Sequence, residues 1–396
     1  MECEWFDMRP FFLDEKLCSF CLGSLMGAST KVPGWIRGKA ILSVFGLGDG
    51  SCSCCKDIFL SCIDKMLEEA LELVQEYEFS SVKSGAVVPP EVIEKLDRLR
   101  ALHGLMNAES VKLTVTGYLD MELSRRLGTD VSYDPDILLL FDFRRRKVST
   151  WVKPVYVYGR YRKLERGISQ SRWICSWCEG KGCEKCEYTG YKYPLSVERL
   201  IGEPMKEVFE ADDYKIHGAG REDVDVRMLG RGRPFVMEVL NPRRRSVDLG
   251  ELERIINERG EGKVEVLDLR FADRKEIVSL KRAHARKVYR VKVQVEGFTN
   301  EEAKLLEEKL SGAEIRQRTP IRVLRRRADR IRRRKVYEFR VESFDDHGFT
   351  ATLLCDGGLY IKELISGDEG RTSPSVSELL NKKAKCIELD VMEVLI

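Results

Sequence analysis

Apolar residues in the first half of the chain recur with the period of an α-helix. From about residue 61 they return every three or four positions, which predicts one helix with a buried face. This face consists of Ile63, Met66, Leu67, Ala70, Leu71 and Val74. A second helix is predicted after Pro89 and Pro90. Its inward positions are Val92, Ile93, Leu96, Leu99 and Leu102.

Other stretches alternate between apolar and polar residues, as strands do. Residues 111–117 alternate, and residues 136–142 and 148–158 form a predicted hairpin around the basic turn Arg144–Lys147. Further strands are predicted at 214–217, 233–240, 287–295, 336–341, 350–354 and 387–394. Helices are predicted at 195–210, at 249–258 and, with a capping-box pattern, from Thr299. The order of these elements predicts an α+β fold with a mixed, largely antiparallel sheet and flanking helices.

The length of 396 residues exceeds one average domain, so we expect two or three domains. The predicted divisions are a cysteine-rich segment at 1–60, an α+β module at 61–194 and a second domain at 195–396. Thirteen cysteines, behind a start without a basic or apolar signal region, indicate a reducing, cytoplasmic location. The longest apolar run, Ile137–Phe141, is too short to cross a membrane, and we expect no membrane association.

Two groups of cysteines have the spacing of metal ligands. Cys175 and Cys178 precede a glycine-containing turn, and Cys183 and Cys186 follow it. Four such thiolates predict structural zinc, with an iron–sulfur site as the rival interpretation. The second group is Cys18, Cys21, Cys52 and Cys55, with Cys54 between the last two. Here unused buried thiols are the alternative, and a mixed site that joins the first of these pairs to one of the later turns stays open.

Residues 220–230 alternate carboxylates and guanidiniums between two glycines, in a predicted loop between strands. Asp223 is flanked by arginines and should be ionised, which makes it a candidate nucleophile or base. Asp225 is the competing candidate. An Arg–Asp network that only fixes the loop is the structural alternative.

Two basic stretches indicate a polyanionic partner, although the net charge is only +3. Residues 316–335 contain eleven Lys or Arg against one acid, Asp329. Residues 156–163 mix tyrosines with basic residues, a combination that can stack on unpaired bases and contact phosphates. Tyrosines that pack a sheet, with solvated charges outside, are the structural alternative. An acidic loop inside such a surface repels phosphate unless it does chemistry. The pattern therefore favours an RNA-modifying enzyme over a non-catalytic, zinc-containing RNA-binding adaptor.

Three segments resemble the motifs of pseudouridine synthases, in the same order. Gly220–Asp223 resembles their Arg-x-Asp element, and Lys287–Val291 resembles the Lys-x-Tyr strand of the TruB branch. Gly358–Leu364 resembles the Gly-x-Tyr-Ile-Arg-x-Leu segment of the same branch. Longer strings at 158–163, 220–227 and 318–324 resemble the archaeal tRNA pseudouridine synthases of the family numbered ten. This resemblance extends from about residue 148 to residue 396 and, more loosely, to the cysteine-bearing start.

The resemblance implies isomerisation of uridine to pseudouridine at positions 54 and 55 of the tRNA T-loop, with another RNA site as the alternative. Asp223 is then the nucleophile. Arg221, Tyr289, Tyr360 and Lys362 bind the substrate, with Tyr289 stacked on a flipped-out base and Lys362 paired with the carboxylate. Residues 61–194 are implied to be a THUMP-like RNA-binding domain. We expect tRNA as the partner, no cofactor for catalysis and no obligate protein partner.

Overall fold

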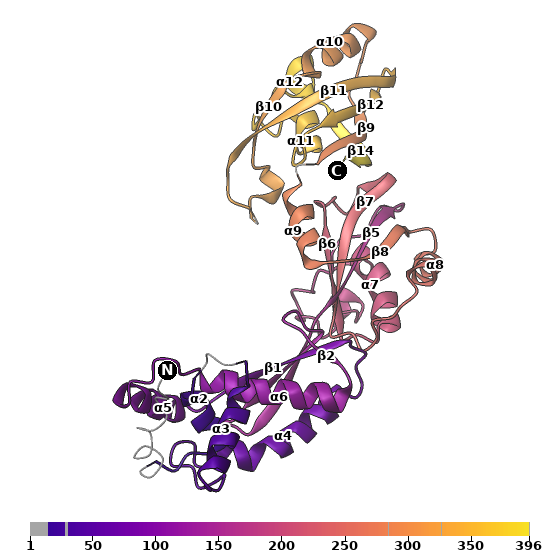
Figure 1. Cartoon of the computed structure of the whole chain (residues 1–396). Helices are drawn as coiled ribbons and strands as arrows, with labels where there is room; N and C mark the ends of the chain where they lie inside the picture. Colours follow the sequence, from indigo (N-terminus) through magenta and orange to yellow (C-terminus); the bar gives the residue numbers. More distant parts are fainter. Residues whose placement is uncertain (1–14, 28–30, 284, 326, 396) are drawn as a thin grey trace. The chain divides into compact units, whose positions relative to one another are not determined.

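The computed structural model describes residues 15–27, 31–283, 285–325 and 327–395 (Figure 1). The chain divides into two compact units: Met1–Lys153 with Asn241–Arg245, and Pro154–Leu240 with Ser246–Ile396. This division differs from the predicted boundaries at residues 60 and 194. The cysteine-bearing start shares one core with the helices that follow it, and residues 155–163 form a strand in the sheet of the second unit. No helix in the described part of the chain is long and apolar enough to span a membrane.

The first unit is a four-stranded sheet packed against helices. The strands lie in the order β2-β1-β3-β4, in which β1 pairs in parallel with both β2 and β3. Its strands are β1 (Ser81–Val87), β2 (Asp130–Val131), β3 (Ile137–Asp142) and β4 (Lys147–Val152). Its helices are α2 (Ser19–Leu25), α3 (Gly34–Val44), α4 (Ile58–Val74), α5 (Pro90–Leu102) and α6 (Val111–Leu127). Helices α4 and α5 confirm the two predicted helices.

Residues 111–117, predicted as a strand, begin helix α6 instead. Ser110 caps the helix, because its side chain accepts a hydrogen bond from the backbone N–H of Lys112. The buried apolar residues Val111, Val115, Leu119 and Leu123 recur every four positions, and this helical period outlasts the short local alternation. A second expectation is also wrong: Leu102, at the end of α5, is 76% exposed rather than inward.

The predicted hairpin is confirmed for β3 and β4, which pair antiparallel from Ile137↔Val152 to Asp142↔Lys147. Its second strand is shorter than predicted. Pro154 follows β4 and has no N–H to donate to a ladder, and the next strand belongs to the second unit.

The second unit is a ten-stranded sheet with the order β13-β10-β11-β12-β9-β14-β7-β5-β8, and β6 pairs with β7. The strands are β5 (Val155–Lys163), β6 (Asp213–Gly218), β7 (Arg227–Leu240), β8 (Val264–Ala272), β9 (Arg286–Gln294), β10 (Glu314–Arg318), β11 (Ile331–Asp345), β12 (Gly348–Cys355), β13 (Thr372–Ser373) and β14 (Lys385–Leu395). The helices are α7 (Val197–Val208), α8 (Leu249–Gly260), α9 (Arg274–Arg282), α10 (Asn300–Leu310), α11 (Ile361–Ser366) and α12 (Val376–Leu380), with 3₁₀ turns η2 (Glu184–Cys186) and η3 (Ile321–Val323). The predicted mixed, largely antiparallel sheet is confirmed.

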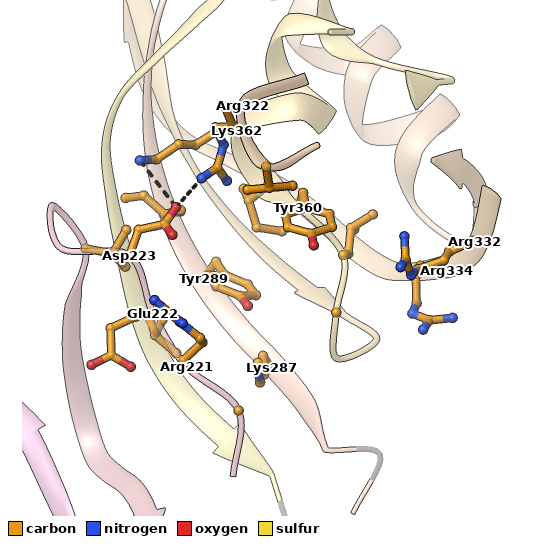
Figure 2. Close-up of a pocket in the computed structure, with 18 of the residues that line it drawn as sticks. Arg221, Glu222, Asp223, Lys287, Tyr289, Arg322, Arg332, Arg334, Tyr360 and Lys362 are labelled. Atoms are coloured by element: carbon orange, nitrogen blue, oxygen red, sulfur yellow. Dashed lines mark hydrogen bonds and ion pairs between the residues drawn. The ribbon is translucent and has the colours of Figure 1, made fainter. Parts of the chain in front are cut away.

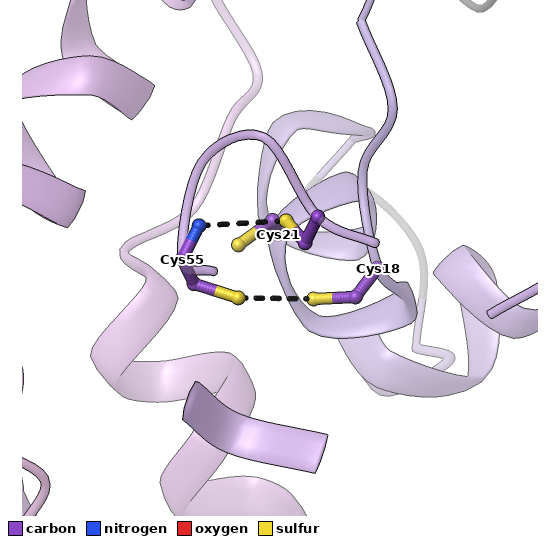
Figure 3. Close-up of side chains that lie close together, drawn as sticks. Cys18, Cys21 and Cys55 are labelled. Carbon is purple, nitrogen blue, oxygen red and sulfur yellow. Dashed lines mark hydrogen bonds between the residues drawn. The ribbon is translucent and has the colours of Figure 1, made fainter. Parts of the chain in front are cut away.

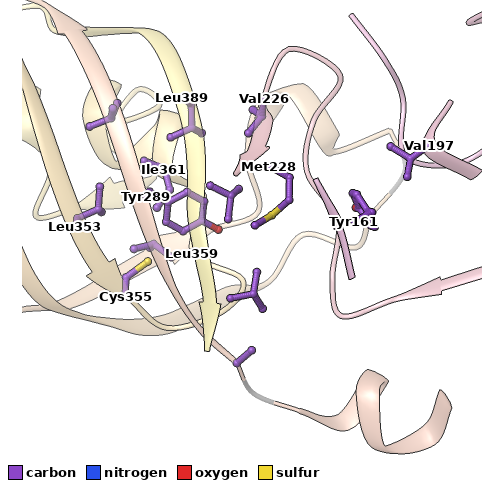
Figure 4. Close-up of a cluster of buried hydrophobic side chains, with 14 of the residues drawn as sticks. Tyr161, Val197, Val226, Met228, Tyr289, Leu353, Cys355, Leu359, Ile361 and Leu389 are labelled. Carbon is purple, nitrogen blue, oxygen red and sulfur yellow. The ribbon is translucent and has the colours of Figure 1, made fainter. Parts of the chain in front are cut away.

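Strands β7 and β14 form the one parallel pair among the described strands of this sheet, with Arg227 opposite Asp390 and Met228 opposite Val391. They join its two halves. Figure 1 shows α7 and α8 beside β5–β8, and α10, α11 and α12 beside β9–β14. The core continues through the junction, where Tyr289 lies among apolar side chains from both halves (Figure 4). The loop that precedes β7 therefore lies where the two halves of the sheet meet.

The tyrosine-rich strip at 156–163 is not the RNA-binding surface that the sequence predicted. It is strand β5, which is paired on one side with β7 and on the other with β8. Tyr161 and Lys163 are fully buried and Tyr156 is 7% exposed. A tyrosine inside a sheet core cannot offer its ring to a base.

Candidate active site

The loop between β6 and β7 borders a cavity of about 520 Å³. Gly220 begins its turn with φ +83°, a conformation that favours glycine. A Cβ atom at this position would also lie 2.9 Å from Nζ of Lys287 and 3.2 Å from Nη1 of Arg233. The lining includes Arg221, Asp223, Tyr289, Arg322, Tyr360 and Lys362. The cavity therefore gathers all five predicted catalytic and substrate-binding residues, together with Arg322.

Asp223 presents a half-exposed carboxylate to this cavity (Figure 2). Its Oδ2 accepts a hydrogen bond from Nη1 of Arg322 at 2.8 Å and lies 3.7 Å from Nζ of Lys362. Arg322 is itself held by Glu363, whose carboxylate is buried and 2.6 Å from its Nε. Burial opposes the charge of Arg322, but the bonds to Glu363 and Asp223 outweigh it and raise its pKa. A permanently charged guanidinium thus faces Asp223.

Asp225 lies outside the cavity lining and is 64% exposed. Both of its carboxylate oxygens accept hydrogen bonds from Nζ of Lys362, at 2.6 and 2.8 Å. Burial raises the pKa of Asp225, but the contact with Lys362 outweighs burial and lowers it overall. Lys362, expected to pair with Asp223, is therefore closer to Asp225, and Arg322 makes the closer contact with Asp223.

The side chain before Asp223 points the opposite way, into the core. Glu222 is buried and pairs with the buried Arg233 at 2.9 Å. The hydroxyl of Tyr161 donates to the same carboxylate, 2.9 and 3.0 Å from its two oxygens. Gln170 completes the network, because its Nε2 donates to the Tyr161 hydroxyl at 2.8 Å and to the carbonyl of Gly220 at 3.0 Å. This network fixes one side of the loop in the sheet.

Lys163 fixes the loop backbone directly. Its buried Nζ donates to the carbonyls of Ile168, Asp223 and Val224 at 2.8, 3.0 and 3.1 Å. Burial lowers the pKa of Lys163 to about 8. The peptide that carries Asp223 is thus hydrogen-bonded to a side chain of β5, a strand paired on both sides.

Two tyrosines form apolar walls of the cavity. Tyr289 is 8% exposed, and burial raises the pKa of its hydroxyl. Tyr360 is held at the start of α11 by Gln317: the Tyr360 N–H donates to Oε1 at 2.8 Å, and Nε2 donates to the Tyr360 carbonyl at 3.0 Å. Arg221 lies at the rim, with its guanidinium 5.5 Å from the ring centroid of Trp173.

Sequence reasoning did not single out Arg322, Glu222 or Lys163. Arg322 lies inside the family-like string at 318–324, and Lys163 ends the string at 158–163. Both strings thus contained a signal, but the roles depend on contacts between distant segments. No local pattern distinguishes Glu222, whose side chain is buried, from Asp223 beside it.

Each predicted group of four cysteines comes together by itself. The sulfur atoms of Cys18, Cys21, Cys52 and Cys55 converge in the first unit (Figure 3), and those of Cys175, Cys178, Cys183 and Cys186 converge in the second. The mixed pairing between the groups is therefore wrong. Cys54 is not part of its group, and its thiol lies 3.7 Å from the carbonyl of Val92.

The spacing of the sulfur atoms fits one metal ion in each group. Within a group all ligand atoms lie within 4.8 Å of one another, with Sγ–Sγ distances of 3.5 Å for Cys18–Cys55 and 3.7 Å for Cys178–Cys186. A tetrahedral zinc with Zn–S bonds of about 2.3 Å holds its sulfurs roughly 3.8 Å apart. The backbone N–H of Gly182 also donates a hydrogen bond to the Cys178 sulfur at 3.2 Å, as outer-sphere donors to metal ligands do.

Comparison with known proteins gives a consistent result. A family model described as Pus10, C-terminal, matches residues 156–395. The tRNA pseudouridine synthase Pus10 of Korarchaeum cryptofilum is 52% identical, over 88% of this chain and 94% of that protein. The Pus10 of Methanothermobacter marburgensis is 44% identical over 96% of both chains, and that of Pyrococcus furiosus is 40% identical over 98% and 97%.

The class that these matches define is the tRNA pseudouridine synthases. The chain belongs to the Pus10 family of that class. It is therefore an isomerase that modifies tRNA, rather than the non-catalytic adaptor that the sequence alone left open.

Proposed function

We propose that this protein converts uridines 54 and 55 of the tRNA T-loop to pseudouridine, with Asp223 as its nucleophile or base. The observation that carries the proposal is the geometry of Asp223. Its carboxylate is accessible in the cavity, faces Arg322 at 2.8 Å, and shares the cavity with the ring of Tyr289. Asp225, in contrast, is bound at both oxygens by Lys362 and lies outside that cavity.

The chemistry needs no redox step, because one glycosidic bond is exchanged for another within a nucleotide. Asp223 attacks C1′ of the ribose or takes the 2′ proton, and the N1–C1′ bond breaks with its electron pair left on the base. The base turns, and C5 forms a bond to C1′ as the Asp223–C1′ bond breaks or, if Asp223 took the 2′ proton, as that proton returns to C2′. The C5 proton then leaves to a base, and N1 gains a proton. Tyr289 stacks on the flipped-out base during this sequence.

Cations surround the entrance of the cavity and favour an RNA substrate. Arg327, Arg332 and Arg334, from the predicted basic run, line it opposite the acidic loop. Nη1 of Arg332 donates to Oγ1 of Thr319 at 2.9 Å, and Nε of Arg334 donates to the carbonyl of Gly357 at 3.0 Å, so both side chains are held in place. Positive groups at fixed positions suit the phosphates on both sides of a flipped nucleotide.

The two cysteine groups act as structural zinc sites in this proposal. Each offers four protein ligands and no open position, which is the pattern of a structural rather than a catalytic zinc. Since thiolate ligands must stay reduced, and no described cysteine is in a disulfide, we place the protein in the cytoplasm. The first unit, with its basic turn Arg144–Lys147, is proposed to bind the tRNA at a distance from the modified loop.

The test is incubation of the full-length protein with an unmodified tRNA transcript, followed by pseudouridine-specific mapping. We expect product at positions 54 and 55, and much slower reaction of an isolated T-arm hairpin. Binding should weaken steeply with salt, because several phosphates release counterions. Product confined to another tRNA site would refute the T-loop assignment while keeping the enzyme class. An isolated T-arm hairpin that reacts as fast as the full tRNA would refute the proposed mode of tRNA binding.

A further inference from the structure

One buried cation in the cavity lacks a partner. Lys287 is 8% exposed and lines the cavity, yet its Nζ makes no hydrogen bond or ion pair with any residue in the described ranges. The nearby carboxylates are already paired with other residues. Asp223 and Glu363 pair with Arg322, and Glu222 pairs with Arg233. An unpaired ammonium away from water is unfavourable unless a ligand supplies the acceptor.

The surroundings of Lys287 do not neutralise it. Burial and the positive charge of Arg233 lower the pKa of Lys287 to about 8, against weaker support from the thiol of Cys355 and the carboxylate of Glu222. The Glu222 oxygens already accept from Tyr161 and Arg233. At neutral pH the amine therefore stays largely protonated, and its side chain lines the cavity.

The position of Lys287 relates it to the base rather than to the sugar. It lies on β9 two residues before Tyr289, so both side chains project from the same face of the strand. In Figure 2, Asp223 and Lys287 lie on opposite sides of Tyr289. The ammonium approaches the reactive loop closely at Gly220, where a Cβ atom would stand 2.9 Å from its Nζ. If Asp223 acts at the ribose and Tyr289 stacks on the base, Lys287 faces the edge of the base.

We propose that Lys287 is a further catalytic residue, whose ammonium donates a hydrogen bond to a carbonyl oxygen of the uracil and stabilises the detached base. This inference rests on the proposed function. When the N1–C1′ bond breaks, the electron pair left on N1 spreads onto O2 and O4. The ammonium stabilises that anion without giving up its proton. When C5 bonds to C1′ and loses its proton, and N1 is protonated, the base is neutral again, so the interaction is strongest at the intermediate.

The first test is Lys287→Met, which keeps the length of the side chain and removes its charge. We expect the single-turnover rate on unmodified tRNA to fall about 100-fold, with tRNA affinity unchanged. The melting temperature should stay the same or rise, because an unpartnered buried charge is removed. Lys292→Met is the matched control, since Lys292 is an exposed residue of the same strand, and it should react as the wild type does.

A second substrate separates a catalytic role from a structural one. With 5-fluorouridine at the target position, the base leaves as a more stable anion and depends less on Lys287. The rate of N1–C1′ cleavage should then fall less in Lys287→Met than it does with uridine. An equal fall with both substrates, or a lower melting temperature, would show that Lys287 only maintains the structure.

Two further outcomes would overturn the inference in distinct ways. If Lys287→Met weakens tRNA binding and lowers the slope of log affinity against log salt by about 1, its partner is a phosphate. If the variant reacts at the wild-type rate, Lys287 has no role in the reaction although the proposed function holds. Failure of the wild-type protein to modify the T-loop would instead refute the proposed function itself.

Discussion

Two carboxylates that are neighbours in one loop have opposite environments. Glu222 is buried in the sheet, where Arg233 and Tyr161 occupy its oxygens. Asp223 faces the cavity, where Arg322 binds one of its oxygens and the side chain keeps 40% of its exposure. Each has a guanidinium, but only Asp223 keeps an oxygen that substrate can reach. Both carboxylates form an ion pair, so an ion pair alone does not tell a structural carboxylate from a candidate reactive one. The two differ in the number of oxygens that are left to accept a further hydrogen bond.

The contacts of the buried residues also explain how the part of the loop that faces the cavity stays in place. Nζ of Lys163 donates to the carbonyls of Asp223 and Val224, and Nη1 of Arg233 donates to the carbonyl of Ala219 at 2.8 Å. These bonds hold the backbone of the loop while they leave the Asp223 side chain free. The proposed nucleophile is thus positioned through its backbone and oriented by one guanidinium, with little restriction of its outer oxygen.

The largest expected effect separates Asp223 from its other acidic neighbour. Asp223→Asn should lower the single-turnover rate at least about 10,000-fold, because an amide is neither a nucleophile nor a base. Asp225→Asn, the matched control, should lose less than about tenfold, since its carboxylate mainly holds Lys362. Both variants should keep the wild-type melting temperature and tRNA affinity. Full turnover by Asp223→Asn together with an inactive Asp225→Asn would assign the chemistry to Asp225.

The second prediction concerns Glu222, the buried carboxylate of the loop. Glu222→Gln leaves Arg233 charged, buried and without its counterion, and should lower the free energy of unfolding by about 3–5 kcal/mol. Denaturant melts of the variant and of Asp223→Asn measure the contrast. Replacing both partners, as in Glu222→Gln with Arg233→Met, should recover part of the loss because no unpaired charge remains. If Glu222→Gln unfolds at the same denaturant concentration as the wild type, the two carboxylates differ less in their contribution to stability than their burial indicates.

The sequence was informative where one local period decides the structure. The helix at 61–74 and the capping box at Thr299 follow from spacing alone, and the cavity contains Asp223, Tyr289 and Tyr360 as their motifs predicted. The prediction failed for β5, because tyrosines and basic residues have the same composition in a core strand and on an RNA-binding surface. Strands β7 and β8, which pair with β5 on its two sides and make it an inner strand, are distant from it in sequence.

The same limit explains why Arg322 was not singled out. It is one of eleven basic residues between 316 and 335, and nothing local marks it. Its role depends on Glu363 and Asp223, which lie 41 and 99 residues away along the chain. The motifs predicted residues that line the cavity, but they did not predict the side chains that hold these residues in place.

A smaller effect is expected from the cysteine group at 175–186, which follows Trp173, the residue that Arg221 contacts. Purified protein should contain zinc, and Cys175→Ser with Cys178→Ser should remove the metal of this group and lower the melting temperature by roughly 5 °C. Below that temperature the rate should fall less than about tenfold, because the buried network holds the loop. Metal analysis and single-turnover rates test both parts. Absence of zinc and iron from freshly reduced protein would refute the metal assignment, and a rate loss as large as that of Asp223→Asn would mean that the loop depends on the metal site.

The smallest expected effect tests the guanidinium on the cavity side. Arg322→Lys keeps the positive charge but cannot bridge Glu363 and Asp223 as a planar group with several fixed donors. We expect about a tenfold lower single-turnover rate, equivalent to about 1.4 kcal/mol, with tRNA affinity within twofold of the wild type. Arg322→Met should lose more, because Glu363 is then buried without its partner, and its melting temperature should fall as well. Arg254→Lys, a change of an exposed arginine that bridges Glu251 and Glu258 on α8, serves as the control. If Arg322→Lys affects affinity and not rate, Arg322 binds phosphate and does not orient Asp223, and the reactive carboxylate is then positioned by its backbone alone.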